Sequence, residues 1–310
     1  MRKNGKDLLK TAIFFIACLA VLLGAEVIAW MTQRDFGNVR VTNVTYENYN
    51  GIPIRAKLMR PVDATDKNTV PGIVYIHGYQ NNRETSDAYC IELARRGFAV
   101  LNIDAIGRGN SGIPGDPKNP FFDCTYGARS SFEYLKNLPF VNTGSLGMMG
   151  HSLGAEMAYR VALDNPSVKA LVISGFAYGT DATENTPKNM LMIFGKWDEY
   201  RERMTRTDDF EREWMHTPQT KKAIPVDNPR LGVTYGDFAS GTARRVFMPR
   251  GIHIQESHSR EPIAEAVVWM RNALHPKDRY WKDAQIQIWP IKEWATLVAM
   301  IACFASLLPL

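Results

Sequence analysis

The pentapeptide Gly150-His151-Ser152-Leu153-Gly154 is the clearest candidate for chemistry in this chain of 310 residues. A serine that has a glycine two residues before it and another two residues after it is typical of a nucleophile elbow. The elbow is a tight turn between a strand and a helix that exposes the serine hydroxyl. Residues 145–149 are apolar enough for a short buried strand, and residues 155–163 contain good helix formers. The sequence therefore predicts that Ser152 is a nucleophile.

A serine hydroxyl attacks well only when a histidine accepts its proton and a carboxylate orients that histidine. Asp198 directly follows an apolar, strand-like stretch and is our candidate for the acid, with Glu199 as the fallback. An aspartate at this position also suits a helix N-cap, and the two roles are compatible. His253 follows another strand-like stretch and a short turn, and is the preferred base. His258 is the alternative base, although the adjacent Ser259 suits the N-cap of a following helix.

Strand-like and helix-like stretches alternate between residues 39 and 274, which indicates an α/β fold with a mostly parallel sheet and helices on both faces. The turn signal Asn50-Gly51 predicts an antiparallel hairpin at the start. Buried strands are expected over residues 72–76, 98–103, 145–149, 168–173, 190–194 and 245–248. Helices are expected over residues 84–96, 124–138 with Asp123 as N-cap, 155–163, 199–216 and 260–274. Residues 218–242 form a long, polar connection that we expect to cover the active site.

The elbow, followed in order by an acid after a strand and a histidine before the last helix, resembles the α/β-hydrolase superfamily. The resemblance is to enzymes of the dienelactone-hydrolase and esterase kind, and it covers roughly residues 39–274. It implies the α/β-hydrolase fold and a triad of Ser152, His253 and Asp198. It also implies that the chain hydrolyses a small-molecule carboxylic ester or acyl substrate through an acyl-enzyme, without a cofactor.

The same resemblance implies two backbone N–H groups that stabilise the oxyanion of the transition state. One belongs to Leu153, directly after the nucleophile. The other is assigned to Tyr79, in the loop after an early strand. The loop 104–112 resembles the family's glycine-rich loop, and we interpret it as structural, with Asp104 accepting hydrogen bonds from backbone amides. No cluster in the sequence has the spacing of metal ligands.

Two alternatives to an esterase remain open at this point. A serine peptidase of the same fold would need a site for a peptide amine or carboxylate, which the sequence does not reveal. A hydrolase-like domain without activity, serving as the extracytoplasmic part of a membrane or transport assembly, would also fit the fold, because fold alone does not determine function.

The composition agrees with one α/β domain plus attached segments, since 45% of the residues are hydrophobic and 22% are charged. The net charge of +5 comes from basic residues spread along the chain, so we expect no nucleic-acid partner. The four cysteines do not form a disulfide framework. Cys90 and Cys124 are the only pair outside the apolar ends, and we expect both to be buried thiols.

Both ends of the chain have a composition suited to a membrane. Four basic residues, Arg2, Lys3, Lys6 and Lys10, precede an apolar run that reaches Met31. We favour an uncleaved anchor over a signal peptide because no convincing cleavage site follows. If the basic residues before the anchor stay in the cytoplasm, the hydrolase domain after it lies outside the cytoplasm.

A second apolar run, from Trp294 to Leu310, is expected to cross back, in a chain that continues past Leu310, or else to pack as a tail against the domain. The expected division is therefore an anchor over residues 1–34, a hydrolase domain over 35–285 and a hydrophobic transmembrane segment over 286–310. The sequence does not indicate an oligomeric state.

Overall fold

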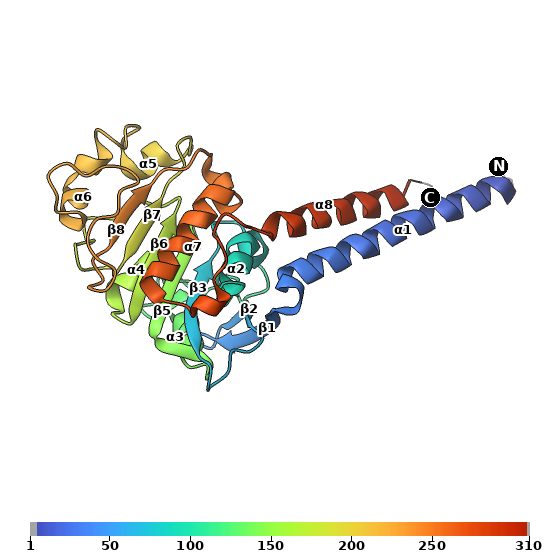
Figure 1. Cartoon of the computed structure of the whole chain (residues 1–310), viewed down its shortest axis with the longest axis horizontal. Coiled ribbons are helices and arrows are strands. Elements are labelled where there is room, and N and C mark those ends of the chain that lie inside the picture. The colour runs from blue at the N-terminus through green and yellow to red at the C-terminus, as the bar shows by residue number, and fades with distance from the viewer. Residues whose placement is uncertain (1–4, 309–310) are drawn as a thin grey trace.

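A mixed sheet forms the centre of the domain in the computed structural model, which describes residues 5–308 (Figure 1). Within those residues it has eight strands in the order β1-β2-β4-β3-β5-β6-β7-β8. β1 and β2 form the expected antiparallel hairpin, β2 pairs antiparallel with β4, and every other pairing is parallel. The strands are β1 (Val39–Glu47), β2 (Pro53–Pro61), β3 (Val70–Ile76), β4 (Ala99–Ile103), β5 (Val141–His151), β6 (Val168–Ser174), β7 (Met190–Ile193) and β8 (Arg244–Phe247).

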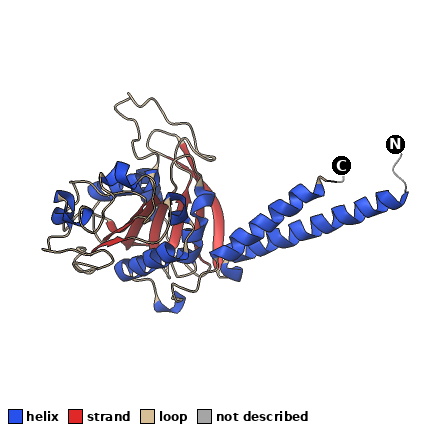
Figure 2. Cartoon of the chain, turned by 90° about the horizontal axis from the view of Figure 1, so that it is seen from above, coloured by secondary structure: helices blue, strands red, loops and turns tan. Residues whose placement is uncertain are grey.

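Helices cover both faces of the sheet, which gives three layers and two apolar cores (Figure 2). Helices α3 (Ala128–Lys136) and α4 (Leu153–Asp164) pack on one face, and α2 (Asp87–Ala94) and α7 (Arg260–Leu274) pack on the other. The central strands β3, β6 and β7 are mostly apolar because both of their faces are buried. This is the α/β arrangement that the sequence predicts, with the carboxyl ends of the parallel strands at one edge.

The predicted helix over residues 199–216 is wrong. The structure has a five-residue helix α5 (Arg201–Thr205), a run of turns and the 3₁₀ helix η3 (Trp214–His216). Arg206 ends α5 in the left-handed conformation, with φ +59°. The buried side chains of Phe210 and Trp214 then pack into the core, so tertiary burial overrides helix propensity here.

Asp123 is not the N-cap of α3, because that helix begins only at Ala128, after Gly127 with φ +94°. The Asp123 carboxylate instead accepts hydrogen bonds from the amides of Thr125 and Gly127, both at 3.0 Å, and so organises the turn before the helix.

The segment 218–242 lies along the free edge of β8. After helix α6 (Pro218–Ala223), the chain passes β8 so that Gly232 N donates to Val246 O and Tyr235 exchanges backbone hydrogen bonds with Arg244. Its role in the structure is therefore to cover a sheet edge that would otherwise expose unpaired amides.

The four cysteines are free thiols. Cys90 is buried in α2, as expected. Cys124 is exposed, so the expectation that both thiols are buried is wrong for this residue. It lies in the turn that precedes α3, where the sequence predicted a helix.

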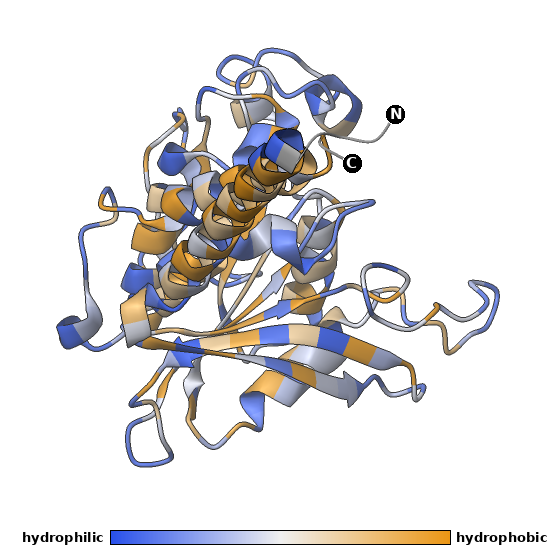
Figure 3. Ribbon diagram, turned by 90° about the vertical axis from the view of Figure 1, so that its right-hand side faces the viewer, coloured by the Kyte–Doolittle hydropathy of each residue, from blue (hydrophilic) through white to orange (hydrophobic). Residues whose placement is uncertain are grey.

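Helices α1 (Gly5–Gln33) and α8 (Trp289–Ser306) form an antiparallel pair that projects away from the domain (Figure 1). Small buried residues line their contact, which lets the two backbones approach closely: Cys18, Ala25, Ala29, Ala295, Ala299 and Ala302. Their outer surfaces are mostly apolar and exposed (Figure 3). We name this pair the terminal hairpin.

Within residues 5–308, α1 is the one helix long and apolar enough to cross a membrane by itself. Helix α8 has 18 residues and has the charged pair Lys292 and Glu293 at its fourth and fifth positions. Its apolar part, Trp294 to Ser306, is about 20 Å long, against roughly 30 Å for the hydrocarbon core of a bilayer. A second full crossing therefore stays a prediction. Arg2, Lys3 and Leu310 lie outside the described residues.

Asp87, at the start of α2, joins the terminal hairpin to the domain. Its buried carboxylate accepts a hydrogen bond from Gln33 of α1 at 2.7 Å, and it lies 3.0 Å from the ammonium of Lys57 and 3.1 Å from that of Lys292 in α8. Both helices are thus attached to the same buried charge.

Candidate functional site

Ser152 occupies the turn between β5 and α4, with φ +53° and ψ −121°. This left-handed conformation is strained for a residue with a side chain, as in a nucleophile elbow. The two flanking glycines are sterically required. A Cβ at Gly150 would overlap the backbone of Gly154, and a Cβ at Gly154 would overlap the backbone oxygens of Ile76 and His77 at the end of the neighbouring strand β3. The elbow predicted from five residues is therefore present in the fold.

Asp198 and His253 lie together although 55 residues separate them. The Asp198 carboxylate is buried after β7 and lies 2.7 Å from Nδ1 of His253, the first residue of the 3₁₀ helix η4 (His253–Ser257). Glu199 takes a different part, because its carboxylate accepts a hydrogen bond from the backbone N–H of His253 at 3.1 Å. The ring edge of Tyr200 also packs on the imidazole, with centroids 4.9 Å apart.

Ser152 and His253 both border the end of β6. The Ser152 amide donates to the Ser174 carbonyl at 2.7 Å, and the His253 ring packs over Gly175, where an added Cβ would overlap it. Among residues 5–308, the Ser152 hydroxyl makes no hydrogen bond, so the structure brings the imidazole to the elbow without closing the contact between them. Such contacts often tighten only when substrate binds.

His258 lies away from this pair. Its ring packs against Trp289 at the base of α8, with centroids 6.2 Å apart, and burial lowers its pKa. The structure therefore places His253 beside Asp198, and His258 beside the terminal hairpin.

The two expected oxyanion donors flank the elbow. Leu153 is the first residue of α4, so its amide has no acceptor within the helix. The loop after β3 passes close above the serine, since a Cβ added to Gly78 would lie 3.4 Å from the Cβ of Ser152, and Tyr79 is the next residue.

Buried His77 holds this loop in place. Its Nδ1 lies 2.8 Å from the Gly78 carbonyl, and its Nε2 lies 3.1 Å from the Ala105 amide. Nδ1 is therefore the donor and Nε2 the acceptor, which requires a neutral ring. Burial lowers the pKa of His77 and so favours that form.

Comparisons with known proteins agree with this fold. A family model described as serine aminopeptidase, S33, matches residues 68–221, a range that contains Ser152 and Asp198 and ends before His253. An esterase of Pyrococcus furiosus, Pf2001, superposes with a TM-score of 0.54 at 14% identity, covering 78% of this chain and 96% of that one. An S-formylglutathione hydrolase of Agrobacterium tumefaciens gives 0.54 at 14% identity, covering 76% and 96%. The chain belongs to the α/β-hydrolase superfamily.

Two curated relatives of this α/β-hydrolase match over shorter stretches. A serine hydrolase-like protein of Dictyostelium discoideum is 29% identical over 142 residues, which is 46% of this chain and 36% of that protein. The uncharacterized protein YcjY of Escherichia coli (strain K12) is 28% identical over 134 residues, 41% of this chain and 43% of that protein. The chain thus covers less than half the length of each relative.

The α/β-hydrolase site contains a second carboxyl group that the sequence analysis missed. Glu256 is fully buried behind the imidazole, with Oε2 4.0 Å from Nδ1 of His253. Its Oε1 accepts a hydrogen bond from Gly195 N, and its Oε2 lies 3.4 Å from the Ser174 hydroxyl. Burial, and then the neighbouring charge of Asp198, raise the pKa of Glu256 well above its usual range. Both effects favour the neutral carboxyl group in the folded protein.

His151, inside the elbow, also has a structural role, which its position in the motif did not indicate. Its Nε2 lies 3.0 Å from the carbonyl of His253 and 3.4 Å from Oε2 of Glu256. Burial, and then the proximity of His253, lower the pKa of His151 to about 3. A neutral His151 ties the elbow to the loop that carries His253.

His151, His253 and Glu256 place three potential metal-ligand atoms within 4.8 Å of one another. Each of these side chains already has a partner. His151 Nε2 lies on a backbone carbonyl, His253 Nδ1 on Asp198, and Glu256 Oε1 on the amide of Gly195. The cluster therefore fits a hydrogen-bonded support for the imidazole better than it fits a cation site.

Asp104 acts as expected in the loop after β4. Its carboxylate accepts hydrogen bonds from the backbone amides of Arg83 at 2.8 Å and Asn110 at 2.9 Å, and pairs with the Arg83 guanidinium at 2.8 Å. The structural interpretation of this loop is confirmed.

Proposed function

We propose that this chain is a membrane-anchored serine hydrolase that cleaves carboxylic esters through an acyl-enzyme. The observation that carries the proposal is the 2.7 Å contact between Asp198 and His253 at the edge of the sheet where the elbow presents Ser152. Superfamily membership supports hydrolysis, and the structural likeness to an esterase supports the ester class.

The proposed reaction has two stages, acylation of Ser152 and hydrolysis of the acyl-enzyme, and the same residues act in both. Ser152 Oγ attacks the ester carbonyl carbon while His253 Nε2 takes its proton, and Asp198 remains ionised to stabilise the imidazolium. The amides of Tyr79 and Leu153 bind the oxyanion, where one donor is worth about 3 kcal/mol in the transition state. The alcohol leaves with the proton from His253, and water then attacks the acyl-enzyme by the same steps to release the acid.

Exposed apolar side chains next to the site residues support an ester with an apolar part. Tyr79 is 59% exposed, Trp197 next to Asp198 is 57% exposed, and Ile252 and Ile254 on either side of His253 are also exposed. Exposed apolar groups gathered in this way commonly mark a surface that binds another apolar group.

A fluorophosphonate probe tests the nucleophile in the full chain. We expect the wild type to be labelled, Ser152→Ala to lose labelling, and the matched control Ser167→Ala, at a serine outside the site, to keep it. Absence of labelling in the folded wild type would refute the proposal and favour a non-catalytic domain.

The same probe tests the base. We expect His253→Ala to reduce the labelling rate by about 10³-fold or more, and His258→Ala to leave it nearly unchanged. The reverse pattern would show that His258 is the base.

A serine peptidase is the second candidate, and the match to the serine aminopeptidase model favours it. Acyl p-nitrophenyl esters and aminoacyl p-nitroanilides separate the two activities under identical conditions. We expect turnover of the esters that depends on Ser152. A higher kcat/KM for the anilides would overturn the ester assignment while leaving the nucleophile intact.

We also propose that α1 anchors the protein with its domain outside the cytoplasm. Between Lys10 and Trp30, α1 is about 30 Å long, which equals the hydrocarbon thickness of a bilayer. Lys6 and Lys10 lie at the end far from the domain, where the positive-inside rule places the cytoplasm.

Exposed Cys124 provides the test of this orientation. A membrane-impermeant maleimide added to intact cells, after permeabilisation of any outer membrane, should label the wild type and not Cys124→Ser. Labelling that requires lysis of the inner membrane would place the domain in the cytoplasm.

A further inference from the structure

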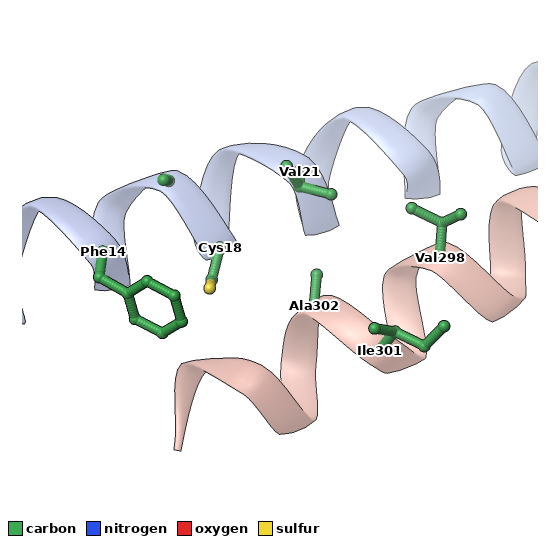
Figure 4. Close-up of a pocket in the computed structure, with 7 residues that line it drawn as sticks. Phe14, Cys18, Val21, Val298, Ile301 and Ala302 are labelled. Carbon is green, nitrogen blue, oxygen red and sulfur yellow. The ribbon is translucent and has the colours of Figure 1, made fainter. Parts of the chain in front are cut away.

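An apolar groove runs along one side of the terminal hairpin. Its part far from the domain has a volume of about 260 Å³ and is lined by residues that include Phe14, Cys18 and Ile301 (Figure 4). Its part near the domain has a volume of about 710 Å³. The two parts share Val21 and Val298, so the groove is continuous along both helices.

The groove ends at a cation where it meets the domain. Arg260, the first residue of α7, is the one charged residue lining the wider part. In the part of the chain that the structure describes, its guanidinium has no carboxylate partner and makes no hydrogen bond, and only its backbone carbonyl is engaged, by Gln287 at 2.8 Å. Trp294 borders the groove at this level and is 68% exposed.

Two exposed tryptophans mark this end as the water interface of the membrane. Trp30 in α1 and Trp294 in α8 both lie at the ends of their helices next to the domain. Tryptophan is enriched at the level of the lipid headgroups. With α1 inserted as proposed above, Arg260 would therefore lie at the depth of the lipid phosphates.

We propose that this groove binds one anionic phospholipid, with its phosphate on Arg260 and an acyl chain along the apolar channel. The proposal rests on the insertion of α1 proposed above. From Ile28 to Phe14 the groove follows about 21 Å of helix, so it is long enough for an acyl chain that crosses one leaflet of about 15 Å.

A bound anionic lipid would give Arg260 a counter-charge, whereas an apolar helix in the groove would not. A guanidinium presents a fork of donors that fits a phosphate, and the pairing leaves no charge uncompensated. An apolar helix of a partner or of a second copy would cover Arg260 without a counter-charge, which is costly. The occupant that fits both ends of the groove is therefore amphipathic and anionic.

The test uses the full chain in nanodiscs of equal parts phosphatidylglycerol and phosphatidylcholine, with the lipids that remain bound after detergent release identified by native mass spectrometry. We expect one retained lipid with a preference for phosphatidylglycerol of about fivefold, the equivalent of roughly one interfacial charge pair. Arg260→Gln should remove the preference. Arg230→Gln, at an exposed arginine outside the groove, should keep it.

A second variant tests the channel without touching the charge. Gly24 lines the groove, and an added Cβ would meet no atom within 4 Å, so Gly24→Leu fills empty space and improves helix propensity. We expect this variant to insert normally and to lose the retained lipid.

Three results would overturn the proposal. The first is a wild type that shows no lipid preference, and the second is an Arg260→Gln variant that keeps the preference. The third is a dimer that carries no lipid, which would identify a second copy as the occupant. A chain that does not float with vesicles would refute membrane insertion itself and the groove with it, whereas loss of esterase activity alone would bear only on the catalytic proposal.

Discussion

Glutamine at position 256 should leave the enzyme nearly as active as the wild type. Burial and the charge of Asp198 raise the pKa of Glu256 well above its usual range, which favours the neutral carboxyl group. A glutamine amide has the same shape, and its oxygen can accept the Gly195 hydrogen bond. We expect kcat/KM for ester hydrolysis within about threefold of the wild type, or roughly 0.6 kcal/mol.

Alanine at the same position should be far more damaging. It leaves the buried N–H of Gly195 without an acceptor, which costs about 1–3 kcal/mol, and the hollow behind the imidazole adds about 1–2 kcal/mol. The free energy of unfolding should fall by about 2–5 kcal/mol in total. The activity should fall by about 10²-fold, because His253 loses a side chain that packs behind its ring.

The pH dependence of stability distinguishes a neutral from an ionised Glu256. Because its pKa in the folded state lies above the unfolded value of about 4.3, the folded protein keeps a proton that the unfolded chain loses. The contribution of Glu256 to stability is therefore full below about pH 4.3 and decreases as pH rises, by at most about 1.4 kcal/mol per pH unit, until the folded-state pKa is passed. Glutamine has no such loss, so Glu256→Gln should gain stability relative to the wild type between about pH 5 and pH 7.

Urea unfolding of the full chain in detergent, followed by tryptophan fluorescence at several pH values, measures this difference. A stability of Glu256→Gln that falls relative to the wild type as pH rises would show that Glu256 is ionised in the folded protein. A loss of activity above about 10²-fold in this variant, with the fold intact, would make the carboxylate a second acid for His253.

Two further substitutions test the elbow and the attachment of the terminal hairpin. Gly154→Ala should prevent the elbow from forming and abolish both the yield of folded full-length protein in detergent and probe labelling. Gly115→Ala, where an added Cβ meets nothing within 4 Å, should behave as the wild type in both measurements. Asp87→Ala removes the buried partner of Lys57 and Lys292 and should lower the free energy of unfolding by about 3 kcal/mol or more, measured by the same urea titration. An Asp87→Ala variant as stable as the wild type would show that the buried charges contribute nothing to the attachment.

The central strands and the elbow were predictable because their signals are local. Apolar runs of five or six residues are visible in the sequence, and Gly150 and Gly154 are needed for steric reasons that act within a few residues. Asp198 and His253 were found because each follows such a run. What the structure adds is their separation of 2.7 Å, which no local pattern contains.

Glu256 and His151 were missed because their properties arise only on folding. Glu256 lies in a polar segment, three residues after His253, which is typical of a solvated surface. Nothing in the sequence shows that Glu256 and His151 become buried. Their shifted pKa values come from burial and from neighbours that are distant in the sequence, Asp198 for Glu256 and His253 for His151. The wrong helix over residues 199–216 has a related cause, because Phe210 and Trp214 turn into a core that brings together distant segments.

The attachment of α1 and α8 to a single buried carboxylate has a consequence for how the enzyme would meet its substrate. A domain held in a bilayer by one flexible tether could rotate and present any face to the membrane. With the terminal hairpin in a bilayer, this domain would keep a constant orientation, because Asp87 contacts both helices. Asp87 starts the helix that follows the loop carrying Tyr79, so that loop is held at a set height above the lipid. Encounter with a lipid-soluble substrate would then become a search in two dimensions along the membrane plane.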